Sequence, residues 1–133
     1  MKYLLDTNAC VTYLNKPDSV VKQRLIGTPR WQICVCSVVK AELFYGAMKS
    51  HNPAQTLLKQ QEFLNQFVSL AFDDPAAGIF GAIRADLTQK GTPIGPYDLQ
   101  IAAIAMAYRL TLVTHNTREF SRISGLNLED WEI

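Results

Sequence analysis

Cysteine is scarce in this sequence, and its spacing is not that of a disulfide framework or a zinc site. The three cysteines are Cys10, Cys34 and Cys36, an odd number with no CxxC pair. If Cys34 and Cys36 lie on a strand, they point to the same face of it. We therefore interpret the cysteines as small core residues, which suggests a reducing, cytoplasmic compartment.

A long hydrophobic run is also missing. No segment approaches the roughly 18 apolar residues that are needed to cross a bilayer. The N-terminal run Met1–Leu5 reaches the acidic Asp6 too soon to be a signal peptide. These absences predict a mature, soluble protein without a membrane partner.

The sequence has no excess of charge of one sign, since 13 basic and 12 acidic side chains leave a net charge of +1. A catalytic domain that acts on nucleic acid can be neutral overall if acidic residues gather in a metal site and basic residues surround it. The balance therefore neither indicates nor excludes a nucleic-acid partner. With 133 residues, 48% of them hydrophobic, the chain has room for one folded domain, which we expect to span residues 1–133.

Short β-type runs alternate with helical patterns along the whole chain. Strands are expected at residues 2–5, 31–35, 69–72, 111–114 and 127–131, and helices at 9–14, 20–26, 37–48, 53–68, 75–91 and 96–109. This alternation predicts an α/β fold in which a mostly parallel sheet of about four to five strands has helices on both faces. Ligands of such sheets bind beyond the carboxyl ends of the strands.

Asp6 is the first candidate for chemistry, because it follows the first expected strand directly. Thr7 and Asn8 both favour helix N-cap positions, so we expect Asp6 to have a role beyond capping. An N-cap aspartate is the alternative interpretation.

Two further carboxylates lie near the starts of apolar helices. Val38 and Val39 precede Glu42 by four and three residues and should share its side of the helix, which disfavours a solvated position for the glutamate. Asp98 follows Pro96 in the first turn of a helix that is apolar on almost every side and therefore largely buried. A solvated glutamate and a helix-dipole aspartate are the alternatives.

Four polar residues follow the fourth expected strand: Thr114, His115, Asn116 and Glu119. Asn116 could simply cap the next turn, and Glu119 could pair with Arg122 on the surface. His115 and His51 have no partner at metal-ligand spacing, so we expect solvation or local packing to explain both.

These groups all fall just past an expected strand or at a helix start beside one. Asp6, Glu42 and Asp98 would repel one another if brought together, and a divalent cation would remove that penalty. Oxygen ligands without a thiolate or a histidine pair select Mg²⁺ or Mn²⁺ over Zn²⁺. The natural substrate for such an ion is a phosphate ester.

Four segments, taken in order, resemble the four motifs of PIN-domain nucleases. They are Leu4–Asn8, Ala41–Leu43 with Gly46, Ile94–Asp98 followed by Ile101–Ala103, and Leu112–Phe120. Their order and spacing, and the total length, are most similar to the VapC toxins of bacterial type II toxin–antitoxin pairs. The resemblance implies a PIN-like three-layer sandwich and a metal-dependent endoribonuclease.

The resemblance also implies a role for each motif residue. Asp6, Glu42 and Asp98 would hold Mg²⁺, or Mn²⁺, and Glu119 would be a fourth catalytic acid. The supporting residues would be Thr7 and Asn8 in the first motif and Thr114 and Asn116 in the fourth, where the latter two orient water or metal. The chain departs from the common pattern at Tyr97, where one form of the third motif has asparagine, and at Asn116, where many PIN domains have aspartate. Both departures bear on whether a second metal binds.

Substrate and partners follow from the same resemblance. It implies an RNA substrate, with tRNA as the first expectation, a cognate antitoxin that inserts a C-terminal segment into the active-site groove, and a homodimer. Arg118 and Lys40 are the candidate phosphate-binding side chains, because they lie near the acids in the sequence.

Three other functions fit the sequence less well. A phosphate-accepting receiver domain needs an acidic pair after the first strand and a lysine after the last, but Asp6 is single and no lysine follows Lys90. A haloacid-dehalogenase-like phosphatase needs a second aspartate where Asn8 stands. A non-catalytic RNA- or protein-binding module with the same fold is the remaining alternative, and the presence of the acids speaks against it.

Overall fold

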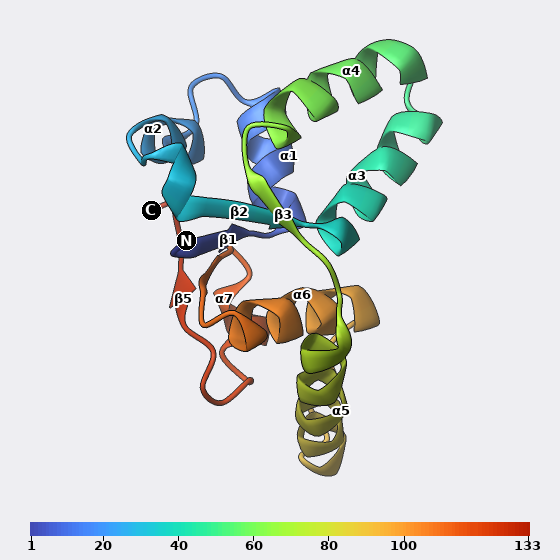
Figure 1. Ribbon diagram of the computed structural model, residues 1–133, viewed down its shortest axis with the longest axis vertical. Coiled ribbons are helices and arrows are strands. Elements are labelled where there is room, and N and C mark those ends of the chain that lie inside the picture. Colours follow the sequence, from blue (N-terminus) through green and yellow to red (C-terminus); the bar gives the residue numbers. More distant parts are fainter.

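Five short strands form a central sheet in the computed structural model, which describes all residues 1–133 (Figure 1). They are β1 (Tyr3–Leu5), β2 (Ile33–Cys36), β3 (Val68–Leu70), β4 (Thr111–Val113) and β5 (Leu128–Glu129). Their spatial order is β3-β2-β1-β4-β5, and every neighbouring pair is parallel. Strands β2 and β3 are therefore added on one side of β1, and β4 and β5 on its other side, so the order of the strands switches between β1 and β4. In open α/β sheets, ligands bind at the carboxyl edge of such a switch point.

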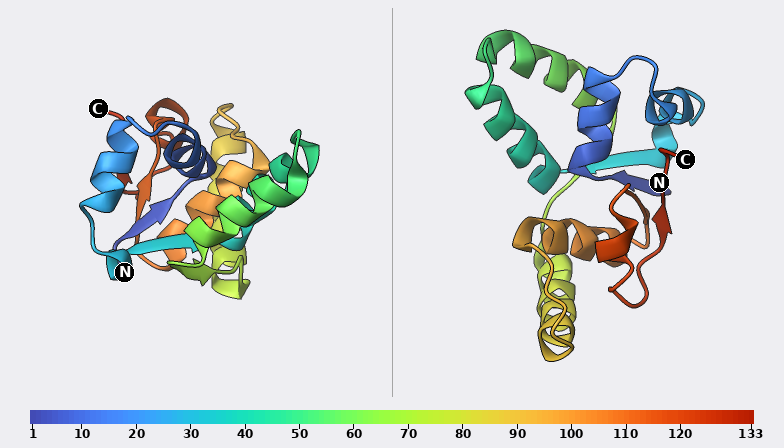
Figure 2. Two further views of the ribbon diagram at one scale, coloured as in Figure 1. Left: turned by 90° about the horizontal axis from the view of Figure 1, so that it is seen from above. Right: turned by 180° about the vertical axis from the view of Figure 1, so that it is seen from behind.

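Seven α-helices cover the two faces of this sheet: α1 (Thr7–Asn15), α2 (Val20–Ile26), α3 (Ser37–Lys49), α4 (Pro53–Leu64), α5 (Asp74–Gln89), α6 (Pro96–Ala107) and α7 (Thr117–Phe120). Helices α1 to α4 lie on one face and α5 to α7 on the other, as Figures 1 and 2 show. The predicted three-layer α/β architecture with a parallel sheet is confirmed. No helix combines the length and the apolar composition that crossing a bilayer requires.

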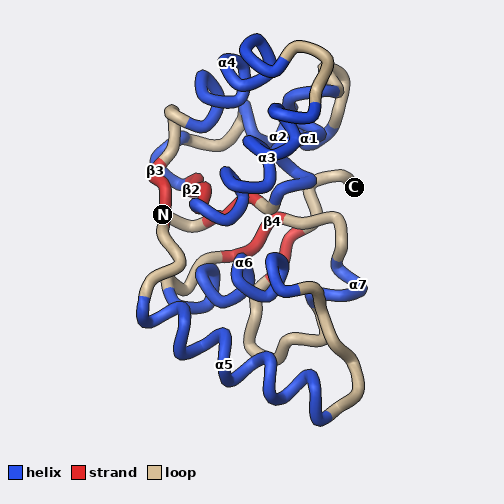
Figure 3. The backbone as a smooth tube through the Cα atoms, turned by 90° about the vertical axis from the view of Figure 1, so that its right-hand side faces the viewer, coloured by secondary structure: helices blue, strands red, loops and turns tan.

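The core is thickest around α6, which lies between the sheet and α5 (Figure 3). This helix is apolar on all sides, and Ala102, Ala103 and Ile104 are completely buried. Alanine brings the helix backbone close to its neighbours, because it adds little volume between them. The amino end of α6 is thereby fixed beside the carboxyl ends of the strands, where Asp98 is located.

Several expected boundaries were wrong, and two of them have a clear structural reason. The helix expected to continue to residue 68 ends at Leu64, because the chain after it forms β3, which pairs with β2 from Val68 onward. Trp31 lies in a 3-10 turn, Arg30–Gln32, and is 70% exposed, so the second strand begins only at Ile33. In the first case, tertiary pairing overrides a local helical pattern.

Candidate active site

Asp6 lies at the carboxyl end of β1 and is the N-cap of α1. Its Oδ1 accepts a 2.8 Å hydrogen bond from the backbone N–H of Ala9, and the residue is only 4% exposed. The expectation that Thr7 or Asn8 caps this helix was wrong, since the backbone of Asp6 is extended and Thr7 already begins the helix. Asp6 therefore anchors α1 and at the same time presents a buried carboxyl group at the switch point.

The electrostatic environment of Asp6 disfavours its charge. The pKa of Asp6 is raised from 3.8 to about 6, mainly by burial and to a lesser degree by the negative charges of Asp98 and Glu132. Hydrogen bonding from the Thr114 side chain and from the Ala9 amide partly offsets this rise in pKa. A carboxylate that loses water without gaining a cation is destabilised in its charged form.

Glu42 lies in α3, which begins at the end of β2. The hydroxyl of Thr7 donates a 2.7 Å hydrogen bond to Glu42 Oε1, so the start of α1 orients this carboxylate. Val38 and Val39 are buried, and Glu42 is half-buried, as their shared side of the helix predicts. Lys40 is half-buried on the same helix and makes no side-chain hydrogen bond.

Asp98 stands in the first turn of α6 and is half-buried. Its pKa is raised by burial first, and then by the negative charges of Glu42 and Glu119. Since the charge of Asp98 also raises the pKa of Asp6, all four predicted acids are electrostatically coupled through Asp98. The fold thus gathers carboxylates from four helix starts at one edge of the sheet.

The segment after β4 supplies a short hydrogen-bonded chain of polar groups. Thr114 is buried, and its Oγ1 accepts a 3.0 Å hydrogen bond from the backbone N–H of Asn116. The Asn116 amide donates a 3.0 Å bond to Glu119 Oε2. The side chain of Asn116 therefore orients Glu119 and does not cap α7. Arg122 donates to the backbone carbonyl of Pro93 instead of pairing with Glu119.

The other predicted residues make fewer contacts. Asn8, in the first turn of α1, is exposed and makes no side-chain hydrogen bond. Arg118, in α7 beside Glu119, is exposed as well. Contact of Arg118 or Lys40 with a substrate stays a prediction.

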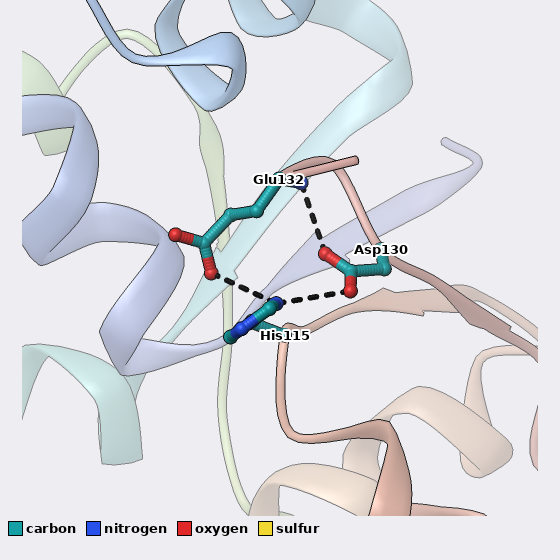
Figure 4. Close-up of side chains that lie close together, drawn as sticks. All are labelled: His115, Asp130 and Glu132. Carbon is teal, nitrogen blue, oxygen red and sulfur yellow. Dashed lines mark hydrogen bonds and ion pairs between the residues drawn. The ribbon is translucent and has the colours of Figure 1, made fainter.

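The expectation that His115 is isolated was wrong. Its Nδ1 lies 3.0 Å from Asp130 Oδ2 and 3.3 Å from Glu132 Oε2, and Figure 4 shows the ring facing both carboxylates. The pKa of His115 is raised by its hydrogen bond to Asp130 and by the negative charge of Glu132. These partners come from the C-terminal tail, which leaves β5 beside the end of β4. No sequence spacing signals this pairing, since only the order of the strands brings the two segments together.

Two surface cavities adjoin Glu42, one on each side of it. One of about 460 Å³ lies among α1, α3 and α4 and includes Thr7, Lys59 and Gln60 in its lining. The other, of about 560 Å³, lies between α3 and the start of α6 and is lined by Ser37, Val38, Ala41, Glu42, Tyr45, Tyr97 and Gln100. Glu42 is the one residue that lines both cavities, so its carboxylate stands between them.

The chemistry of the donor set fits a divalent cation. Asp6, Glu42, Asp98 and Glu119 offer only carboxylate oxygens, which are hard ligands. Their mutual repulsion contributes to the raised pKa values of Asp6 and Asp98, and a bound cation would reverse that effect. His115, Asp130 and Glu132 offer three ligand atoms within 4.8 Å of one another, but the histidine already pairs with both carboxylates.

Comparison with known proteins agrees with this geometry. The family model of the PIN domain matches residues 3–126. The chain is 43% identical over 132 residues to a tRNA(fMet)-specific endonuclease VapC from Salmonella typhimurium, with 98% of each chain covered. It is 41% identical to the ribonuclease VapC2 of Rickettsia felis, with 99% of each covered.

Solved structures show the same relationship. The structure superposes on a chain of the DNA-bound VapBC complex from Salmonella typhimurium with a TM-score of 0.93, at 40% identity and with 98% of each chain covered. For VapBC2 from Rickettsia felis bound to a promoter DNA fragment, the TM-score is 0.90 at 39% identity, with 98% of this chain and 99% of that chain covered. The chain therefore belongs to the PIN-domain family and, within it, to the VapC ribonucleases.

Proposed function

We propose that this protein is a Mg²⁺-dependent endoribonuclease, the toxin of a type II toxin–antitoxin pair, which acts as a single domain over residues 1–133. Asp6, Glu42 and Asp98 hold the metal, with Mn²⁺ as an alternative ion, and Glu119 is the fourth acid. The observation that carries the proposal is the coupling of these four carboxyl groups through Asp98 at the switch point of the sheet. The charges of Glu42 and Glu119 raise the pKa of Asp98, and the charge of Asp98 raises the pKa of Asp6. This repulsion does not stabilise the fold, and a bound dication would relieve it.

Three of the four acids have a neighbour that fixes their direction. The Ala9 amide holds Asp6, the Thr7 hydroxyl holds Glu42, and the Asn116 amide holds Glu119. When bound, the metal polarises a phosphoryl oxygen and lowers the pKa of a water molecule. Asn116 fixes one oxygen of Glu119, and the role proposed for the other oxygen is to orient the attacking water. Catalysis then depends on carboxylates that are set in position before the RNA arrives.

For the substrate we propose tRNA, and first of all tRNA(fMet), because a relative that is 43% identical along nearly its full length bears the name of that specificity. For partners we propose a cognate antitoxin, since the similar solved chains are parts of VapBC complexes, and a homodimer. Arg118 and Lys40 are proposed to contact RNA phosphates. Expression of the chain alone should arrest bacterial growth, and co-expression of the antitoxin should relieve the arrest.

The deciding experiment is RNA cleavage by the purified chain with Mg²⁺ and with EDTA. Asp98→Asn should abolish cleavage while the fold and its circular dichroism are kept, because asparagine is close to isosteric with aspartate. Asp86→Asn is the matched control, since Asp86 lies on α5 in an exposed pair with Lys90. Equal cleavage by the parent and Asp98→Asn would assign the activity to a contaminant or to another site.

Metal binding can be measured without activity. Mg²⁺ should raise the melting temperature of the parent and of Asp86→Asn, because a ligand that binds only the folded state stabilises it. Asp6→Asn and Asp98→Asn should lose most of that increase. If Mg²⁺ left the melting temperature of the parent unchanged, the proposed metal site would be wrong. RNA binding without cleavage by the parent would indicate a non-catalytic module.

A further inference from the structure

Two large aromatic side chains lie exposed near Glu42 and Asp98. Tyr45, on α3, is 64% exposed, and Tyr97, on α6, is 59% exposed. Both line the cavity of about 560 Å³ on the α6 side of Glu42. The tyrosines lie on different helices, so packing within one element does not explain why they meet there. Neither hydroxyl makes a hydrogen bond within the protein, so no hydrogen bond accounts for the position of the two rings.

We propose that this cavity binds the RNA base next to the scissile phosphate, with Tyr97 and Tyr45 as the surfaces on which the base stacks. The proposal rests on the proposed ribonuclease function and adds a substrate-binding site to it. The base is placed by geometry, because Tyr97 directly precedes Asp98 and Glu42 itself lines the cavity. A nucleotide whose phosphate lies at Glu42 and Asp98 therefore has its base within reach of this cavity.

The lining fits a nucleobase better than it fits a purely apolar ligand. Exposed tyrosine rings bind unpaired bases by stacking, which tolerates any base because every base has a π face. Gln100 adds an amide with both donors and an acceptor, which can pair with the polar edge of a base. The cavity volume of about 560 Å³ falls in the usual range of small-ligand sites.

A positive charge completes the arrangement. The ammonium group of Lys49 lies 4.5 Å from the centroid of the Tyr45 ring, one helical turn further along α3. A lysine in this place covers part of the tyrosine and leaves its charge free for a phosphate. Proteins bind single-stranded nucleic acid through this combination of an aromatic surface and an adjacent cation. The same exposed rings could instead seat a second copy of the chain, and the experiment below separates the two.

The experiment uses single-turnover cleavage of a short RNA that contains the cut site mapped with the parent protein in Mg²⁺. Tyr97→Ala should weaken the apparent RNA affinity by about 5-fold to 100-fold, the range expected for loss of one stacked base. Tyr97→Phe should restore most of it, because stacking needs the ring and not the hydroxyl. Trp31→Ala is the control, since Trp31 is an equally exposed aromatic at the amino end of β2, on the opposite edge of the sheet.

A second substrate tests which interaction was lost. In it, the nucleotide beside the cut carries no base. The parent should bind this abasic RNA as weakly as Tyr97→Ala binds the normal RNA, and Tyr97→Ala should cause no further loss with it. If Tyr97→Ala weakened binding of both RNAs to the same degree, Tyr97 would act other than by stacking and the proposal would be wrong.

The remaining outcomes are also decisive. If Tyr97→Ala converted a dimer into a monomer in sedimentation, the cavity would be an interface between copies and the base site would be rejected. If the parent cleaved RNA and Tyr97→Ala cleaved it unchanged, only the base site would fail. If the parent did not cleave RNA at all, the proposed function would fail as well. The Mg²⁺-induced rise in melting temperature should be the same in Tyr97→Ala and in the parent.

Discussion

The hydroxyl of Thr7 and the carboxylate of Glu42 join two helices that start from neighbouring strands. Their 2.7 Å hydrogen bond spans 35 residues of sequence. Thr7 opens α1 after β1, and Glu42 lies in α3 after β2, and these two strands are paired in parallel. One oxygen of Glu42 is thereby fixed, and the other makes no hydrogen bond within the protein. A residue of the first motif therefore positions the acid of the second.

Removal of this hydroxyl should lower activity with little effect on stability. Thr7→Val keeps the shape of the side chain but deletes the donor, so Glu42 loses the bond that orients it. We expect kcat/KM for RNA cleavage to fall by about 10-fold, which corresponds to one hydrogen bond of about 1.4 kcal/mol. Thr12→Val, on the same helix and without a side-chain hydrogen bond, is the control. Full activity in Thr7→Val would show that Glu42 needs no help from Thr7.

Asp6→Asn should make the metal-free protein more stable above pH 6. Asparagine is as good an N-cap as aspartate and can accept the same bond from Ala9. The folded pKa of Asp6, about 6, lies above its ordinary value of 3.8. The folded state therefore holds the proton more tightly than the unfolded state. The stability that this proton confers is complete below pH 3.8 and is lost as pH rises through 6, by as much as about 3 kcal/mol.

Urea unfolding in EDTA checks this prediction between pH 4 and pH 8. The free energies of unfolding of parent and Asp6→Asn should agree near pH 4 and diverge as pH rises. In excess Mg²⁺ at pH 7.5 the parent should become the more stable of the two proteins, because only the parent keeps the Asp6 carboxylate to bind the cation. Asp18→Asn, at an exposed position after α1, controls for the loss of one surface charge. A constant difference at all pH values would mean that the charge of Asp6 is not the cause.

The His115 ring should titrate above its ordinary pKa of 6.5, because Asp130 and Glu132 favour its charged form. The stability from this pair is present below pH 6.5 and is lost as pH rises through the folded pKa. Proton NMR of the imidazole gives the midpoint directly, and His51→Gln removes the only other histidine signal. Asp130→Asn should lower the midpoint more than Glu132→Gln does, since the bond to Asp130 is the larger cause. An unchanged midpoint in both variants would refute the pairing.

The alternation of β-type runs with helical patterns was enough to predict the fold class, and strand ends located the acids. Asp6 follows from this reasoning because it lies just beyond a recognisable hydrophobic strand, and Asp98 because it lies in the first turn of a recognisable apolar helix. Boundaries were less predictable, because a three-residue strand such as β3 exists only through its pairing with β2. The local sequence before Val68 is as compatible with helix as with the turn that is present. Pairing between strands, and not propensity, decides such a segment.

Contacts within the candidate site were predictable only where its residues lie close to a motif. The bond between Thr7 and Glu42 and the pairing of His115 with the C-terminal tail depend on which strands are neighbours. Their sequence separation carries no periodic signal. Tyr45 gave no signal at all, because an exposed tyrosine on a helix is unremarkable until the start of another helix is placed opposite it. Long-range contacts of this kind require the topology of the sheet.

The three cysteines should be inert in the folded protein, as their interpretation as core residues requires. Cys10, Cys34 and Cys36 are all 0% exposed. Burial raises the pKa of the Cys10 thiol well above its ordinary value of 9 and that of Cys36 to about 11, so little thiolate forms at neutral pH. An aromatic disulfide reagent at pH 7.5 should therefore label none of them in the native state and all three in denaturant.

The rate of labelling gives a sharper test than its extent. Because Cys34 and Cys36 lie on β2 in the middle of the sheet, the reagent should reach them only when the whole domain unfolds. Their labelling rate in dilute urea should then rise with the same dependence on urea as global unfolding. Cys10 packs from α1 against the same core, so it should follow the same rate. Fast labelling of Cys10 alone would mean that α1, and with it Asp6 and Thr7, opens while the sheet stays folded, and a metal site built on that helix could not be preformed.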